Sequence, residues 1–272
     1  MRRFVLIATA LGALVVAAGA FAASSSSSIN TYKATLKFTT KAAGTAKKPV
    51  PLGFTQNIKA SGTNGNRTAV LTDITTKVYG IKADGKDFPK CSSAKIAANQ
   101  NDTKCPKGAL VASGWITALV GPANDFGPSG NAATGACDPL LHVWNSGQGK
   151  LTFFFVDQGT KHQCLGGILH TGQVGPYPAT YKMRGKYMVL DVPVPSYVSF
   201  PAPGEAGSLV TEHLVWKKAT KKVHGKTVAT FSSVGCKGKN RPYSTKFTAN
   251  LPTPSGTAGP SQVSTVSAKA RC

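Results

Sequence analysis

The stretch TYKATLKFT at residues 31–39 decides the fold class, because apolar and polar residues alternate along it one for one. A period of two is typical of a β-strand with one buried face and one wet face, and here the wet face carries lysine. The segment 243–249, near the other end of the chain, has the same form. Both segments indicate an all-β protein.

Many short β-type runs lie between these two segments, separated by Gly, Pro, Asn-Gly and Asp-Gly turns. Regularly spaced short strands without a long amphipathic helix predict an antiparallel β-sandwich. One short helix is expected at 93–99, and the unbroken apolar run 153–156 predicts a central strand covered on both faces. The runs are 54–58, 67–81, 109–120, 140–144, 151–157, 164–172, 181–192, 209–217 and 226–233.

The first residues have the order of a secretory signal peptide: Arg2 and Arg3, an apolar run at 4–16, then small residues. We expect cleavage after Ala22, and the apolar run is shorter than the roughly 20 residues that span a bilayer. Residues 23–28 are rich in serine and predict a flexible tether. The remainder, 29–272, is expected to be a single β-sandwich domain, secreted or held in the cell envelope, with no transmembrane segment.

Six cysteines, an even number, indicate disulfides in an exported chain. The sequence leaves the connectivity open, and we favour nearest-neighbour pairing because it closes short loops. No two cysteines stand at the close spacing of a zinc site. The favoured pairs are Cys91 with Cys105, Cys137 with Cys164, and Cys236 with Cys272.

The chain is strongly basic, with a formal net charge of +22, and the excess belongs to its two ends. Acidic residues occur only from Asp73 through Glu212. If the first and last strands lie together, their lysines form one positive surface that attracts anionic polymers or polysaccharide without selecting a specific nucleic acid. A solvated face that only keeps the protein soluble is the alternative. The candidate polyanion-binding residues are Lys217, Lys218, Lys221, Lys222, Lys237, Lys239, Arg241 and Lys246.

The sequence offers little for catalysis. It has two glutamates, lacks a G-x-S-x-G nucleophile elbow, and uses its cysteines in the expected disulfides. Glu212 stands beside His213, but an exposed strand position accounts for a polar residue there. We therefore expect no catalytic residue, no metal and no cofactor. One alternative is a small metal site formed by His162, Cys164 and His170 with Asp138 and His142, and another is a hydrolase site where Asp138 or Asp157 lies near His142, His162 or His170.

Carbohydrate binding is the second functional hypothesis. A β-sandwich that binds sugars uses exposed aromatic rings as platforms, with polar side chains around them. A core position is the favoured alternative for these residues, because a buried Trp is common in the core of such sandwiches. The candidates are Trp115, Trp144, Trp216, Tyr177 and Tyr197.

The motifs Phe88-Pro-Lys-Cys91 and Cys105-Pro106, the latter followed by a strand, resemble those of a group of uncharacterised exported proteins of actinobacteria. The resemblance extends to Cys236 ahead of the strand at 243–249 and to a cysteine at the C-terminus. It implies a secreted β-sandwich with structural cysteines, and it supplies no activity, ligand or catalytic residue. The stretch around Cys137 and Cys164 matches no part of this pattern.

Overall fold

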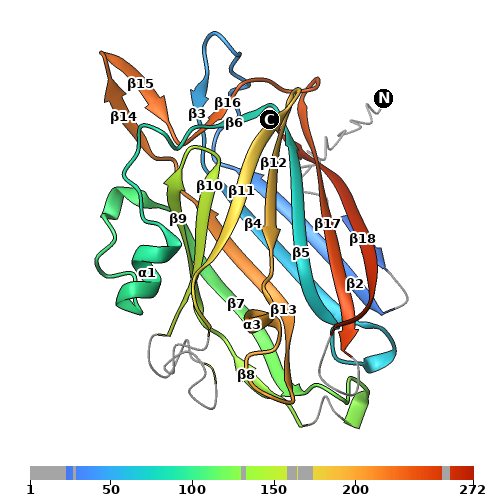
Figure 1. Ribbon diagram of the computed structural model, residues 1–272. Coiled ribbons are helices and arrows are strands. Elements are labelled where there is room, and N and C mark those ends of the chain that lie inside the picture. Colours follow the sequence, from blue (N-terminus) through green and yellow to red (C-terminus); the bar gives the residue numbers. More distant parts are fainter. Residues whose placement is uncertain (1–22, 27–28, 130–132, 158–163, 165–173, 253–257) are drawn as a thin grey trace, which may run out of the picture.

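The computed structural model describes residues 23–26, 29–129, 133–157, 164, 174–252 and 258–272. Thirteen strands form one antiparallel sheet that curls into a nearly closed barrel (Figure 1). In spatial order they are β1 (Ala23–Ser26), β2 (Asn30–Phe38), β4 (Phe54–Gly62), β13 (Glu205–Trp216), β7 (Leu110–Pro122), β9 (Leu140–Gly147), β10 (Lys150–Val156), β11 (Tyr177–Arg184), β12 (Tyr187–Pro193), β5 (Val70–Tyr79), β17 (Asn240–Pro252) and β18 (Ala258–Arg271), with β8 (Gly135–Cys137) paired to β7.

The predicted all-β, antiparallel, disulfide-linked fold is confirmed, but the sandwich is replaced by a barrel. The last strand, β18, lies against β1 and β2, so the two edges of the sheet come together. The alternation at 31–39 requires only that one face be buried. It does not distinguish a second sheet from the opposite wall of the same sheet, and here the opposite wall covers it.

The serine-rich tether is a second difference. Residues 23–26 form β1, which pairs antiparallel with β2 from Ala23 opposite Ala34 to Ser26 opposite Thr31. A strand at a sheet edge is held by backbone hydrogen bonds, so serine can take part without an apolar side chain. The predicted signal peptide 1–22 lies outside the described residues.

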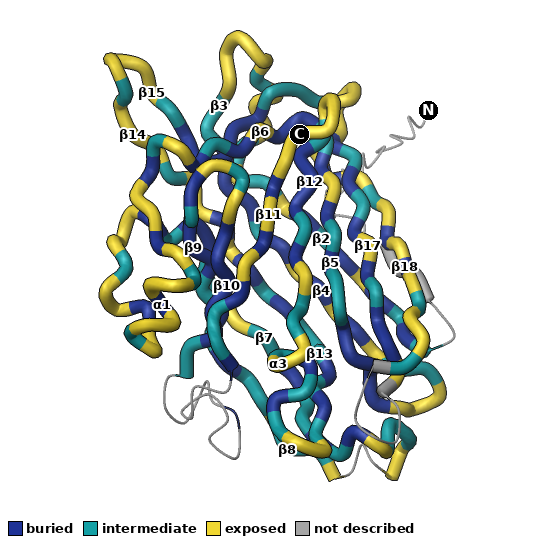
Figure 2. The backbone as a smooth tube through the Cα atoms, in the orientation of Figure 1, coloured by how far each residue is buried: buried dark blue, intermediate teal, exposed yellow. Residues whose placement is uncertain are grey.

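The barrel interior is the hydrophobic core, and buried residues alternate with more exposed ones along most strands (Figure 2). Tyr32 of β2 stacks on Phe247 of β17, with ring centroids 4.2 Å apart. Phe54 of β4 stacks on Trp216 of β13 at 5.2 Å. The first and last strands predicted from sequence therefore meet ring to ring inside the barrel.

Strand β10 is covered on both sides, as its unbroken apolar run predicted. Phe153 and Phe155 join the barrel core, whereas Phe154 points outward into a second cluster with Ile96 and Trp144. Ile96 belongs to helix α1 (Ser93–Asn99), which starts with Ser92 accepting a hydrogen bond from the Lys95 amide. The helix lies at the predicted residues and closes the outer face of the barrel wall.

The two ends of the barrel differ. One end is capped by a small sheet of β3 (Val50–Pro51), β16 (Phe231–Ser233) and β6 (Ile81–Ala83), beside a hairpin of β14 (Thr220–Val223) and β15 (Lys226–Ala229). The other end carries β8 and the short helix α3 (Ser196–Ser199), which was not predicted (Figure 1). Short 3-10 turns occupy Thr63–Gly65 and Lys107–Ala109.

Three disulfides cross-link the barrel and its loops, and their pairing is the one expected from sequence: Cys91–Cys105, Cys137–Cys164 and Cys236–Cys272. The first holds the α1 loop closed, and the second joins β8 to residue 164. The third ties the final residue to the turn before β17, where the Cys272 amide also donates to the Lys239 carbonyl at 3.0 Å. All three are consistent with an oxidising compartment.

Candidate functional site

The capped end of the barrel is crowded with exposed lysines, and we call it the basic end. The small sheet places the 39–49 loop, the 84–90 loop and the β14–β15 hairpin together; Lys221 Nζ donates to the Asp87 carbonyl at 2.6 Å. Asp84 and Asp87 are the acids in these segments. The exposed lysines include Lys41, Lys47, Lys48, Lys82, Lys86, Lys90, Lys217, Lys218, Lys221, Lys222, Lys226, Lys237 and Lys239.

Acidic side chains lie in the loops of the opposite end, which include Asp125, Asp138 and Glu205. Arg67, a cation of this end, is buried over the Phe126 ring, and burial lowers its pKa. In the described part of the chain the one ion pair joins His142 to Asp102, so no lysine of the basic end is neutralised by a salt bridge. The barrel is therefore electrically polarised from end to end.

Six of the predicted polyanion-binding residues lie in the basic end, and Lys246 is exposed on the outer wall of β17. The prediction is wrong for Arg241, which is 0% exposed. Its Nη1 donates to the Tyr79 carbonyl at 3.0 Å and to that of Gly80, and its Nη2 donates to Ser233 Oγ at 2.6 Å. Arg241 holds the cap onto the barrel and presents no charge to a polymer.

The guanidinium of Arg241 lies over the Phe38 ring, 4.9 Å from its centroid, and contacts no carboxylate in the described residues. Burial lowers its pKa to about 10. At neutral pH the group is still charged, and backbone carbonyls and the ring take the place of an anion.

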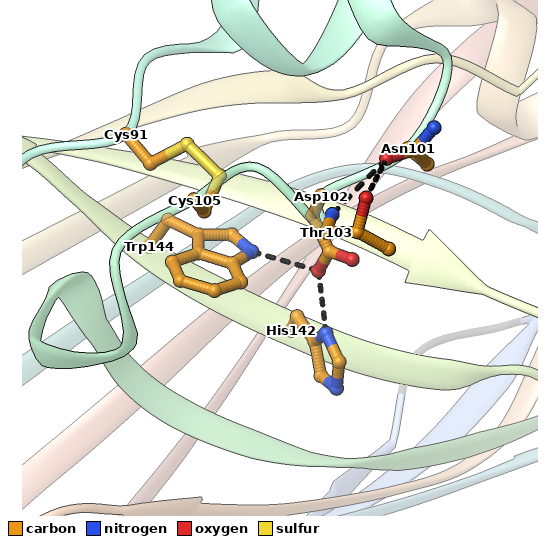
Figure 3. A network of polar contacts seen from close by, with 7 residues as sticks. All are labelled: Cys91, Asn101, Asp102, Thr103, Cys105, His142 and Trp144. Carbon is orange, nitrogen blue, oxygen red and sulfur yellow. Dashed lines mark hydrogen bonds and ion pairs between the residues drawn. A yellow bond between two sulfur atoms is a disulfide. The ribbon is translucent and has the colours of Figure 1, made fainter.

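A polar network on the outer wall joins His142 of β9 to the α1 loop (Figure 3). His142 Nδ1 lies 2.6 Å from Asp102 Oδ2, which also accepts from Trp144 Nε1 at 3.1 Å. Asp102 is brought there by the loop that the Cys91–Cys105 disulfide closes. The site predicted from sequence places His142 with Asp138 or Asp157 and omits Asp102, because the disulfide-closed loop supplies this carboxylate.

The Asp102–His142 pair could orient an imidazole as a general base does, but in the described residues no Ser, Thr or Cys side chain bonds to that ring. The described residues also hold no group of His, Cys, Asp and Glu that could bind a metal ion. His162 and His170 lie outside the described residues. The network thus anchors the α1 loop to the wall.

A shallow groove on the outer wall contains Trp115, which is 37% exposed. Its ring stacks on His213, with centroids 5.6 Å apart, and His213 Nδ1 lies 2.6 Å from Asn57 Oδ1. Tyr197 is also exposed, whereas Trp144, Trp216 and Tyr177 are buried in the cores. Of the five aromatic residues proposed as sugar platforms, two remain available.

A cavity of about 100 Å³ lies inside the barrel, in the half near α3 and β8. Its walls come from strands on opposite sides and are mainly apolar, so a bound molecule would be held by packing. Ser208 also lines it; this side chain is 0% exposed and its Oγ has no hydrogen-bond partner in the described structure. Apolar lining residues include Leu71, Ile74, Ile116, Leu141, Phe155 and Val198.

Glu212 is the charged side chain of this cavity. It is 7% exposed, its Oε1 accepts from Gln56 Nε2 at 2.8 Å, and burial raises its pKa to about 7. Tyr177 lines the wall from β11, and burial and the Glu212 charge raise the pKa of its hydroxyl. The described residues provide no cation beside Glu212.

The prediction that Glu212 occupies an exposed strand position is wrong. Glu212 shares the parity of Leu214 and Trp216, both buried, whereas His213 points outward. The strand's own alternation carried the signal, because a carboxylate in phase with Leu and Trp must face the core. The neighbouring Glu212 and His213 side chains point to opposite faces and cannot act as a catalytic pair.

Together the fold and these sites define a disulfide-linked antiparallel barrel with a basic end and an interior cavity that contains a buried acid. Comparisons with protein-family models, curated proteins and solved structures give no match. No helix among the described residues is long and apolar enough to cross a membrane.

Proposed function

We propose that this protein is an exported, non-enzymatic protein that associates with anionic polymers of the cell envelope or extracellular space through its basic end. The observation that carries the proposal is the concentration of exposed lysines on one end of the barrel, unpaired with acids in the described residues. A positive end with low competition from carboxylates attracts polyanions over a Debye length of about 10 Å at 0.1 M salt.

The attraction is broad, because the contacts come from lysine. Ammonium groups are hydrated point charges, whereas selective phosphate recognition favours the planar fork of arginine. Arg241, the arginine expected among the binding residues, is buried. Phosphate and sulfate polymers of similar charge density should therefore bind with similar affinity.

Binding to immobilised poly(glycerol phosphate), measured between 0.05 and about 0.5 M NaCl, tests the proposal. Retention at low salt should fall steeply and vanish near the upper limit. The double variant Lys221→Gln/Lys222→Gln removes two charges from the exposed β14 strand and should weaken retention.

The matched control is Lys33→Gln/Lys59→Gln, which removes two exposed lysines that face each other on β2 and β4, on the barrel wall. This control should retain most of the binding. Equal losses in both variants would show that only net charge matters, and retention that persists in about 0.5 M salt would contradict an unselective electrostatic contact.

Carbohydrate binding is a second candidate, favoured by the Trp115 groove. An exposed indole flanked by His213 and Asn57 provides a stacking face with polar groups at its edge. Binding of a neutral glycan that survives high salt and is lost in Trp115→Ala, but not in Tyr197→Ala, would favour this function over polymer association. Salt resistance separates the two candidates.

A further inference from the structure

We infer that the barrel cavity is a binding site for a small monocationic amine with a short apolar body, held by Glu212 and the apolar walls. The site is separate from the basic end and does not depend on the proposed polymer association. Three features of the cavity support it: its uncompensated acid, its lining and its size.

Among the described residues the acid has no counter-ion. An ionised carboxylate in an apolar interior is costly unless it is paired, and Gln56 supplies one neutral hydrogen bond. No Lys, Arg or His lines the cavity in the described structure. A ligand ammonium would supply the missing positive charge, so the acid would favour an amine over a neutral or anionic ligand of the same shape.

The polar atoms that line the cavity can accept a hydrogen bond from a ligand. Ser208 Oγ is buried and has no hydrogen-bond partner among the described residues, and the Glu212 carboxylate can accept more than the bond from Gln56. An alkylammonium group has three N–H donors and no acceptor, which suits such a site. A carboxylate ligand would bring further acceptors and a like charge.

The size limits the apolar part of the ligand. The cavity volume of about 100 Å³ is somewhat smaller than an apolar cavity of about 150 Å³ that holds benzene. A straight chain of roughly five carbons therefore suits it. Ile116, Leu141 and Phe155, from three neighbouring strands, would pack on such a chain.

The long-range charge of the protein works against this preference, which makes the test stringent. A formal net charge of +22 attracts anions and repels amines. Any selectivity for an amine must then come from a local negative group, and Glu212 is the acid that the cavity supplies.

Calorimetric titration of the full mature chain with n-pentylamine, 1-pentanol and pentanoate at pH 8.5 tests the inference. A primary amine has a pKa near that of lysine, about 10.4, and stays protonated at this pH. Pentylamine should bind at least tenfold more tightly than pentanol, and pentanoate should bind most weakly. Equal affinity for pentylamine and pentanol, or no binding of either, would overturn the inference.

The variant Glu212→Gln keeps the shape of the side chain and removes its charge. It should lose the preference for pentylamine and still bind pentanol, which reports that the cavity is intact. The matched control is Glu205→Gln, which removes the chain's other glutamate from the start of the same strand, outside the cavity. An unchanged preference in Glu212→Gln would overturn the assignment of Glu212.

The amine preference should also shrink in the native protein between pH 8.5 and 5.5, as Glu212 takes up a proton. Tyr177 is the other titratable side chain among the cavity's described lining residues, and the raised pKa of its hydroxyl keeps it neutral over this range. A preference that stays constant across that range would contradict the role of the carboxylate.

Discussion

Two of the ionisable side chains that the barrel buries, Arg241 at the basic end and Glu212 in the cavity half, have different surroundings. At the basic end, both terminal nitrogens of Arg241 donate hydrogen bonds, and the ring of Phe38 covers the cation. In the cavity half, Glu212 has one bond from Gln56 and empty space beside it. The difference suggests that Arg241 serves the fold, whereas Glu212 costs stability and is available to a ligand.

Removing the arginine should have the largest effect on stability. Arg241→Ala would leave the carbonyls of Tyr79 and Gly80 and the Ser233 hydroxyl short of a donor, and should destabilise the protein by about 3 to 5 kcal/mol. Urea unfolding measures this loss in the free energy of unfolding. Lys239→Ala, an exposed lysine close by, should cost less than about 0.5 kcal/mol; a similar loss there would contradict the structural role of Arg241.

Removing the disulfide next to Arg241 should cause the second-largest loss of stability. Cys236 and Cys272 are 36 residues apart, and the double change to Ser should cost about 3 to 4 kcal/mol by the loop-entropy model. Thermal unfolding should show it. The same change at Cys91 and Cys105, which are 14 residues apart, should cost somewhat less; the reverse order would mean that the α1 loop, and not the basic end, limits stability.

Removing the charge of the buried acid, Glu212, should raise the stability of the protein, whereas the two changes above lower it. The pKa of Glu212 is raised from 4.5 to about 7, so the folded state holds its proton more tightly than the unfolded state does. The contribution of Glu212 to the free energy of unfolding is therefore largest below pH 4.5. It is lost as the pH rises through about 7, and the total loss is about 3 kcal/mol.

Glu212→Gln should therefore stabilise the protein at pH 8 and make little difference at pH 4, as followed by chemical unfolding at both values. Glu205→Gln, at the start of the same strand and outside the cavity, is the control and should not reproduce the gain in stability at pH 8. A Glu212→Gln variant that is less stable at pH 8 would show that the carboxylate is paired in solution.

The smallest expected changes in stability come from replacing two buried serines. Ser233 bonds to Arg241 and to the Ala43 carbonyl, whereas Ser208 has no partner in the described structure. Ser233→Ala should cost about 1 to 2 kcal/mol, and Ser208→Ala should be neutral within about 0.5 kcal/mol. Equal effects of these two substitutions in urea unfolding would erase the contrast between the two halves.

Much of the fold follows from local pattern. The alternation at 31–39, the apolar run at 153–156, the capped helix at 93–99 and the cysteine pairs all match the structure. The run 181–192 did not reveal that Gly185, with a φ of 58°, divides it into β11 and β12. A single glycine permits a tight hairpin without any break in hydrophobicity.

Other elements could not be predicted because their cause is not local. Strand β18 is rich in Ser and Ala and forms by pairing along the whole of β17. The burial of Arg241 depends on carbonyls from the turn after β5, and the Asp102–His142 contact depends on a disulfide-closed loop. The cavity needs walls from both halves of the chain, so no window of sequence contains it.

The near-closure of the barrel leaves a seam. One edge of β18 bonds to β17, while the other faces β1 and β2 with no strand register between them in the described residues. Amide protons along β18 should thus divide by parity: those directed to β17 exchange with deuterium slowly, and those directed to the seam exchange fast. A strand protected at every second residue would mark the line along which the wall can open.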